Sequence, residues 1–349
     1  MAVSSGIAAP RFVPLLARPA DAVLFHRPAG PVTAGAFLAD AFRLAAVLPP
    51  SQPVGAAEPA PALNLCVDRY CFALGFAACL LRGRVSLLTG DRSPAWLAAL
   101  AERFPGLIAL SDTPAALPVP SVPLAVPLVR VPSAEGADSP AGPGARAAAP
   151  PMIPADRFAA VVFTSGSTGE PVGHRKVWGA LAARSIDAGR RFRLTQAQPT
   201  GIVGTVPPQH MYGFETTVLL PLHAAAASWC GPAFYPVDIA AALRTCPAPR
   251  VLVTTPLQLR ALLGADIPLG PLARVISATA PLDPAMAEQA ERRWGTEVWE
   301  IFGATEVGSI ATRRSVAGPV WRSYPRVRFD PLPPATDRVA VGPAAEGRA

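Results

Sequence analysis

Residues 158–176 read FAAVVFTSGSTGEPVGHRK, an apolar run followed by a loop of small and hydroxyl-bearing residues and closed by a lysine. The run 158–165 is almost continuously apolar, which is typical of a strand that is buried on both faces. The glycines of the loop allow a tight turn and a close backbone approach to an anion, and its hydroxyls add hydrogen-bond donors. The closing residue, Lys176, is the single lysine in a chain with 31 Lys and Arg residues.

The loop by itself does not identify a ligand. It matches neither the GxxxxGK[ST] phosphate loop nor the GxGxxG turn of dinucleotide-binding folds. A loop of this composition after a strand is more often a turn than a phosphate site, although a nearby lysine supplies a compact charge that suits phosphate. The order of its residues is more specific than its composition.

Short apolar runs alternate with helical patterns along most of the chain. The predicted strands are 22–26, 63–68, 85–89, 107–111, 158–165, 201–206, 250–255, 273–279 and 297–303. The predicted helices begin after Thr33 and run to about Val47, and cover 69–83 and 94–104. This alternation predicts an α/β fold of mostly parallel sheets with flanking helices. We expect a first α/β subdomain at 1–112, a Pro/Ala-rich connector at 113–155, and a second subdomain at 156–349 that carries the loop.

Composition excludes several classes of protein. Hydrophobic residues make up 51% of the chain and charged residues 16%, as in globular proteins. The apolar runs reach about half a membrane span and no signal-peptide pattern opens the chain, so we expect a cytoplasmic protein without a membrane span. The net charge is +7, but the arginines are scattered without interleaved aromatics, which argues against nucleic acid. The five cysteines form no CxxC or Cys/His pattern and are predicted to be buried thiols.

The order TSGSTGEP, from Thr164 to Pro171, resembles the phosphate-loop signature of the AMP-dependent synthetase/ligase superfamily. That superfamily includes acyl-CoA synthetases, adenylation domains of peptide synthetases and acyl–carrier-protein ligases. In most members a lysine follows the proline at once, whereas here Val172 takes that place and Lys176 stands four residues further on. The spacing PVGHRK is similar to the ligases of aryl-polyene and xanthomonadin-type pigment clusters.

Three further stretches follow in the order of the superfamily. The motif that borders the acyl pocket is resembled by PPQHMYGFETTVLLPLHAAA (207–226). The segment that lies along the adenine is resembled by ISATAPLDP (276–284). The YGxTE motif is resembled by EIFGATEVGSIATRR (300–314), with phenylalanine in place of tyrosine. The resemblance implies roles that fall into five groups: phosphate contacts from Thr164, Ser165, Gly166, Ser167, Thr168, Gly169 and the catalytic Lys176; adenine contacts from Thr279, Ala280 and Pro281; further nucleotide contacts from Phe302, Gly303 and Ala304; catalytic contacts with the AMP phosphate from Thr305 and with Mg²⁺ from Glu306; and a substrate pocket at His210, Tyr212 and Gly213.

Four polar residues of these motifs also have ordinary structural interpretations. Outside its motif, Glu306 would be a surface carboxylate, and His210 a packed or capping histidine. His174 reads as a surface loop histidine, with phosphate contact as the alternative. Glu215 is either a carboxylate stabilised by the N-terminus of a helix or a pocket group, and we favour the first.

The resemblance implies ATP- and Mg²⁺-dependent activation of an aryl or acyl carboxylic acid as its acyl-AMP, followed by transfer to a carrier-protein phosphopantetheine or to CoA. Superfamily members also have a small C-terminal domain with a catalytic lysine, and an aspartate that binds the ribose. No TGD motif follows Glu306 and no lysine follows Lys176, so we expect the small domain to be absent. Either the chain is a truncated or split form whose domain is separately encoded, or it binds its ligands and adenylates weakly. A non-catalytic nucleotide- or acyl-binding remnant and a fatty acyl-CoA ligase are the alternatives.

Overall fold

The computed structural model describes residues 11–49, 60–112, 128–130, 149–164, 171–194, 199–331 and 339–343. The strands in these parts of the chain are β1 (Phe12–Pro14), β2 (Val23–Arg27), β3 (Gly30–Thr33), β4 (Pro61–Asn64), β5 (Val85–Leu88), β6 (Ile108–Ser111), β7 (Leu128–Arg130), β8 (Met152–Pro154), β9 (Phe158–Thr164), β10 (Val172–Val177), β11 (Thr200–Gly204), β12 (Ala226–Trp229), β13 (Arg250–Thr254), β14 (Arg274–Ser277), β15 (Glu297–Ala304), β16 (Gly308–Arg314), β17 (Arg322–Ser323), β18 (Val327–Pro331) and β19 (Val339–Pro343). The helices are α1 (Ala34–Val47), α2 (Arg69–Arg82), α3 (Pro94–Arg103), α4 (Trp178–Arg191), α5 (Met211–Gly213), the π-helix η3 (Phe214–Leu219), α6 (Leu220–His223), α7 (Pro236–Thr245), α8 (Pro256–Gly264), α9 (Pro284–Trp294) and the 3₁₀-helix η4 (Ser315–Ala317).

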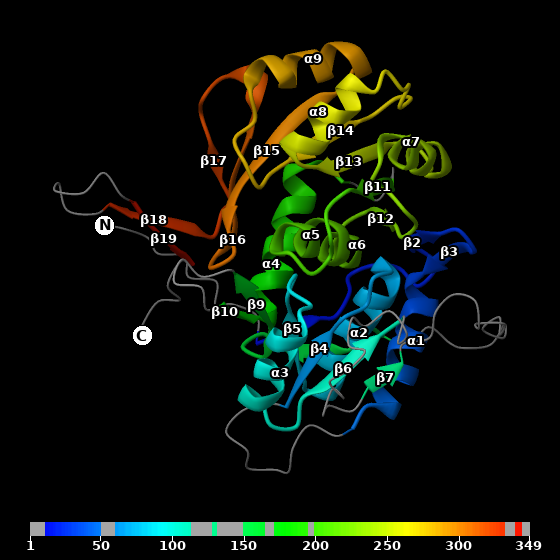
Figure 1. Cartoon of the computed structure of the whole chain (residues 1–349), viewed down its shortest axis with the longest axis vertical. Coiled ribbons are helices and arrows are strands. Elements are labelled where there is room, and N and C mark those ends of the chain that lie inside the picture. The colour runs from blue at the N-terminus through cyan, green and yellow to red at the C-terminus, as the bar shows by residue number, and fades with distance from the viewer. Residues whose placement is uncertain are drawn as a thin grey trace.

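Two large mixed sheets organise these elements. One has the strand order β10-β9-β5-β4-β6-β7, and only its edge strand β10 is antiparallel to its neighbour. The other has the order β17-β16-β15-β14-β13-β11-β12-β2-β3 and is parallel from β15 through β2. In Figure 1 the first sheet lies in the lower half, and the second lies above it with α8 and α9 at the top. The predicted α/β fold of mostly parallel sheets is confirmed.

Neither sheet follows the division that the sequence suggested at the connector. Strands β9 and β10 join the sheet of the N-terminal part, whereas β2 and β3 join the sheet of the C-terminal part. Two short strands also lie inside 113–155, since β7 pairs with β6 and β8 pairs with β1. Backbone pairing at a sheet edge does not depend on an apolar pattern, which is why composition did not indicate these strands. The rest of 113–148 lies outside the described residues.

The ends of the first two helices have the caps that their sequence predicts. The Thr33 hydroxyl accepts a hydrogen bond from the backbone N–H of Ala36, and α2 ends at Gly83 with φ 74°. The strand expected at 63–68 instead spans β4. It ends early because Asp68 is the N-cap of α2, and the Asp112 carboxylate accepts the backbone N–H groups of Val67 and Asp68.

The helices between the two sheets share one aromatic core. Phe214 of η3 packs edge-on against Phe76 of α2 at a ring-centroid distance of 4.9 Å, and Phe76 packs against Trp178 of α4. All five cysteines are buried and none forms a disulfide, as predicted. In the described residues no helix combines the length and the apolar character that crossing a bilayer requires.

Candidate active site

Strand β10 carries a histidine and a lysine side chain on one face. His174 and Lys176 are two residues apart and pair with Val162 and Ala160 of β9, so both point to the same side of the strand. The Nε2 atom of His174 lies 3.1 Å from the hydroxyl of Thr164 at the end of β9. The surface-loop interpretation of His174 is therefore wrong: strand pairing holds it, and its side chain is only 17% exposed.

Lys176 joins the two sheets. Its side chain is buried, and its ammonium Nζ donates a hydrogen bond to the backbone carbonyl of Glu306 at 2.6 Å. Burial lowers the pKa of Lys176, and the negative charges of Glu215 and Glu306 oppose that shift. The single lysine of the chain thus ties the edge of the six-stranded sheet to a hairpin of the nine-stranded sheet.

That hairpin consists of β15 and β16, with Thr305 and Glu306 at its tip. The Glu306 carboxylate is 58% exposed, and its Oε1 atom lies 3.9 Å from Nε2 of His174. Close packing at the base of the tip needs glycine, because a Cβ atom on Gly303 would lie 2.8 Å from the carbonyl oxygen of Gly308. Ala304 is exposed beside it.

Four of the predicted site residues therefore meet at one place: Thr164, Lys176, Thr305 and Glu306, with His174 among them. They come from an antiparallel edge of one sheet and a hairpin of the other. The loop residues Ser165, Gly166, Ser167, Thr168 and Gly169 lie outside the described residues. The nearest described residues on either side of this loop are Thr164, at the end of β9, and Pro171, which precedes β10.

The segment predicted to face adenine follows β14. Thr279, Ala280 and Pro281 are all exposed, and Thr279 has φ 80°. A β-branched residue rarely adopts positive φ, and such strain costs about 1–3 kcal/mol and gathers at functional sites. Because β14 and β15 are parallel, this segment and the Thr305–Glu306 tip lie at the same edge of the sheet.

Phe302 adds an aromatic face near this edge. Its side chain is half-exposed, and its ring centroid lies 5.7 Å from that of Trp321. The guanidinium of Arg313 covers the Trp321 ring at 4.6 Å. Sequence reasoning missed Trp321, because an isolated tryptophan between the last motif and β17 carries no spacing signal.

The predicted substrate-pocket residues are held by different contacts. His210 is the N-cap residue of α5, and its ring packs so closely on Gly90 that a Cβ atom there would lie 2.6 Å from Cε1. The Tyr212 hydroxyl donates to the carbonyl of Ile276 at 2.8 Å, so it ties α5 to the end of β14. Gly213 is required by packing, since a Cβ atom would lie 2.0 Å from the Pro207 carbonyl oxygen.

Glu215 lies in the first turn of η3, in keeping with the helix-terminal position that the sequence favoured, but its main contact is with β16. It is buried in η3, where its carboxylate accepts hydrogen bonds from the backbone N–H of Ser309 at 3.1 Å and from the Ser309 hydroxyl. Burial raises the pKa of Glu215, and the bonds from Ser309 and the charge of Arg184 oppose that shift. No local pattern predicts this contact, because its partners are 94 residues apart.

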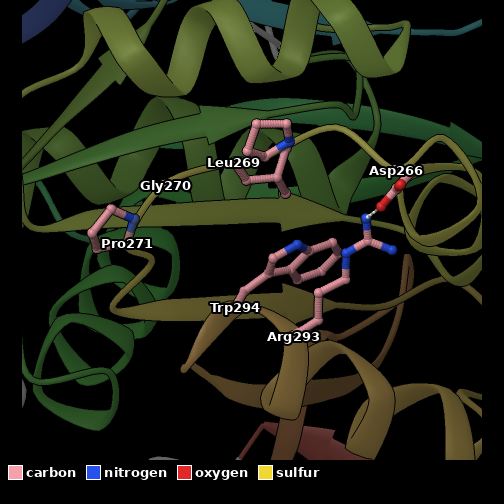
Figure 2. Close-up of a pocket in the computed structure, with 7 residues that line it drawn as sticks. Asp266, Leu269, Gly270, Pro271, Arg293 and Trp294 are labelled. Atoms are coloured by element: carbon pink, nitrogen blue, oxygen red, sulfur yellow. Dashed lines mark hydrogen bonds and ion pairs between the residues drawn. The ribbon is translucent and has the colours of Figure 1, made fainter.

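A pocket of about 440 Å³ lies elsewhere, between the α8–β14 connection and the end of α9 (Figure 2). Its lining residues are Asp266, Pro268, Leu269, Gly270, Pro271, Arg293 and Trp294. It opens where β14 and β15 begin, which is the opposite edge of the sheet from Thr279 and Glu306. It takes no part in the candidate site. No cluster of three or more His, Cys, Asp or Glu side chains suited to a metal occurs in the described parts of the chain.

Comparison with solved structures supports the fold. The chain is similar to apo MatB from Rhodopseudomonas palustris, with a TM-score of 0.72, 19% identity, and coverage of 93% of this chain and 68% of that one. It is also similar to a malonyl-CoA ligase in a ternary product complex with methylmalonyl-CoA and AMP, with a TM-score of 0.70 and 21% identity over 97% of this chain and 72% of that one.

Sequence comparison gives the family. A 4-coumarate–CoA ligase of Rhodobacter capsulatus is 33% identical over 189 residues, which cover 53% of this chain and 46% of the relative. The match thus spans just under half of the length of this curated relative. Residues 17–342 match the family described as AMP-binding enzyme, and these residues include every predicted motif. The chain therefore belongs to the AMP-binding enzyme family.

Proposed function

We propose that this chain activates a carboxylic acid with ATP and prepares it for transfer to a thiol. In this reaction a carboxylate oxygen of the acid attacks the α-phosphorus of ATP, an acyl-AMP forms and pyrophosphate leaves. The observation that carries the proposal is the meeting of Thr164, His174, Lys176 and Glu306 beside the ends of the glycine-rich loop. Family membership supports it, because these residues lie within the range 17–342 that matches the family.

The protein's part in such a reaction is to hold two anions that repel each other in line. Lys176 brings a positive charge to the base of the loop and fixes the Thr305–Glu306 tip through the Glu306 carbonyl. Thr164 and the loop hydroxyls contribute donors to phosphate, and Thr305 contributes one to the AMP phosphate. The exposed Thr279–Pro281 segment and the ring of Phe302 receive the adenine, with Gly303 and Ala304 forming the adjoining backbone.

Mg²⁺ fits this site through Glu306. Mg²⁺ is usually held by one or two carboxylates together with phosphate oxygens and water, so a cage of protein ligands is not required. The Glu306 carboxylate is largely exposed and accessible to such an ion. A bound Mg²⁺ supplies neutralisation of phosphate charge.

We further propose an aryl or acyl acid as the substrate, bound near His210, Tyr212 and Gly213. The thiol acceptor is CoA or the phosphopantetheine of a carrier protein. The curated relative is named for an aromatic acid and CoA, which supports the first acceptor. The PVGHRK spacing, with His174 placed between Thr164 and Glu306, supports an aryl-polyene-type carrier-protein ligase. A cytoplasmic location completes the proposal.

ATP–pyrophosphate exchange tests the proposal directly. Labelled pyrophosphate should enter ATP when the chain is incubated with Mg²⁺ and a panel of aryl and short- to long-chain acyl acids. Exchange that depends on one class of acid also identifies the substrate class. ATP binding by calorimetry, without exchange for any acid, would instead support a non-catalytic nucleotide-binding remnant and reject activation by this chain.

A further inference from the structure

The π-helix η3 places an acidic side chain in the interior. Its i→i+5 geometry is visible in the bond from the backbone N–H of Leu220 to the carbonyl of Glu215. Thr216 and Thr217 reinforce the segment, because their hydroxyls donate to the carbonyls of Tyr212 and Gly213, both at 2.6 Å. π-helical turns are rare and occur often at functional sites. Here the turn directs the Glu215 carboxylate towards β16.

The Glu215 carboxylate holds the first residues of β16. It accepts both the backbone N–H and the hydroxyl of Ser309, so it fixes the second residue of β16, three residues after Glu306. Gly308 has φ 79°, and a Cβ atom there would lie 2.6 Å from Oε1 of Glu215. The close approach of the Glu215 carboxylate to the backbone of β16 therefore depends on the absence of a side chain at Gly308.

Positive charges face this buried carboxylate from two elements. Lys176 approaches from β10 and Arg184 from α4, and both lower the pKa of Glu215 against the effect of burial. The Arg184 guanidinium lies over the ring of Tyr324 at 4.8 Å, and Arg191 lies over the same ring at 5.2 Å. The carboxylate is thus central to a network that joins β10, α4, η3 and β16.

We infer that Glu215 is a positioning residue of the proposed nucleotide site. By holding Gly308 and Ser309, it sets the position of the β15–β16 hairpin, so that the Glu306 carbonyl meets the ammonium of Lys176. The functional part of the inference, which is that Glu306 is placed towards ATP, rests on the proposed function. Its structural part, the placement of the hairpin against Lys176, does not need turnover.

The single lysine allows a direct test. Lysine labelled with carbon-13 at Cε gives one side-chain NMR signal in this chain, and that signal reports the surroundings of Lys176 at one fixed pH. In Glu215→Gln the signal should move towards the position of free lysine. Mg²⁺·ATP binding measured by calorimetry should weaken about tenfold, as expected from loss of a hydrogen bond to a charged group. Ser309→Ala, which keeps the charge and removes one donor, should shift the signal in the same direction by less.

Asp112→Asn is the matched control. Asp112 is also a buried carboxylate that accepts backbone N–H groups, but its donors are Val67 and Asp68, in the connection between β4 and α2 beside the six-stranded sheet. This variant should lower the melting temperature without moving the Lys176 signal. If Glu215→Gln lowers stability as the control does and leaves the signal at its wild-type position, the inference is overturned.

The two proposals fail separately. A wild-type chain that does not bind ATP, but whose lysine signal moves in Glu215→Gln, supports the positioning of the hairpin and rejects the nucleotide function. ATP binding with an unmoved signal rejects only the positioning. If Glu215→Gln does not fold, Ser309→Ala decides, because an unmoved signal in that variant also overturns the inference.

Discussion

Replacing Lys176 by methionine isolates the role of the single lysine. Methionine nearly conserves length and volume but removes the ammonium that donates to the Glu306 carbonyl at 2.6 Å. A hydrogen bond from a charged group contributes about 1.5–3 kcal/mol. Burial of the charge, which lowers the pKa of Lys176, offsets part of that contribution, so we expect a net loss of about 1–2 kcal/mol in the free energy of unfolding.

The effect on ATP should be larger than the effect on stability. Loss of one preorganised charge commonly lowers a rate by about 10²–10³. ATP–pyrophosphate exchange should therefore fall by that factor in Lys176→Met, while denaturant unfolding shows a cooperative transition at somewhat lower denaturant. Lys176→Arg should keep the stability within about 1 kcal/mol but still impair exchange, because a planar guanidinium does not replace a compact ammonium in a buried position.

Arg175→Met is the matched control for charge. Arg175 is the preceding residue of β10, its side chain is exposed on the opposite face, and its guanidinium lies 5.2 Å from the Phe158 ring centroid. It should retain exchange close to the wild-type rate. The reasoning is refuted if Lys176→Met exchanges as fast as Arg175→Met, or if both variants lose exchange equally.

Three other predictions concern single residues. Glu306→Gln should weaken ATP binding by about tenfold in the presence of Mg²⁺ and leave ATP binding without Mg²⁺ nearly unchanged. Calorimetry with and without the ion checks this, and equal weakening under both conditions would contradict it. Burial lowers the pKa of His223 from 6.5 to about 4. Between these two pH values the unfolded chain binds a proton at His223 that the folded chain does not. The free energy of unfolding should therefore fall by up to about 3 kcal/mol as pH falls from about 6.5 to about 4. His223→Asn should lack this component in unfolding curves measured across the range, and an unchanged pH dependence would count against it. Gly213→Ala should destabilise by about 1–3 kcal/mol, because its methyl group would meet the Pro207 carbonyl; a melting temperature equal to that of the wild type would exclude the close approach.

The predictions made from local patterns agree well with the structure. Thr33 begins one helix and Gly83 ends another, as predicted, because a cap depends on residues within one turn. Apolar periodicity located most strands of both sheets to within a few residues. The pattern did not predict β3, β7, β10, β12, β16 and β17 of these two sheets, nor β1, β8, β18 and β19 outside them, because strand pairing depends on the partner strand as well as on a strand's own side chains.

The site was only partly accessible to sequence reasoning. The motifs selected Lys176, Thr305 and Glu306 before any geometry was known, and the structure brings them together. The position of His174 was predicted wrongly and the burial of Glu215 was not predicted, because each was judged from its neighbours in the chain. The partners that define them, Thr164 and Glu306 for one and Ser309 for the other, arrive from other elements.

The sequence by itself determined the family, the α/β class and the short motifs, since these depend on residue order and on periodicity over a few residues. The tertiary structure decided that the single lysine donates to a carbonyl 130 residues away. It also decided that a glutamate in a π-helix is buried against the start of β16. The physical reason is that hydrogen bonding and burial depend on distance in space. The packing of two sheets around a shared layer of helices sets the distances between segments whose sequences share no pattern.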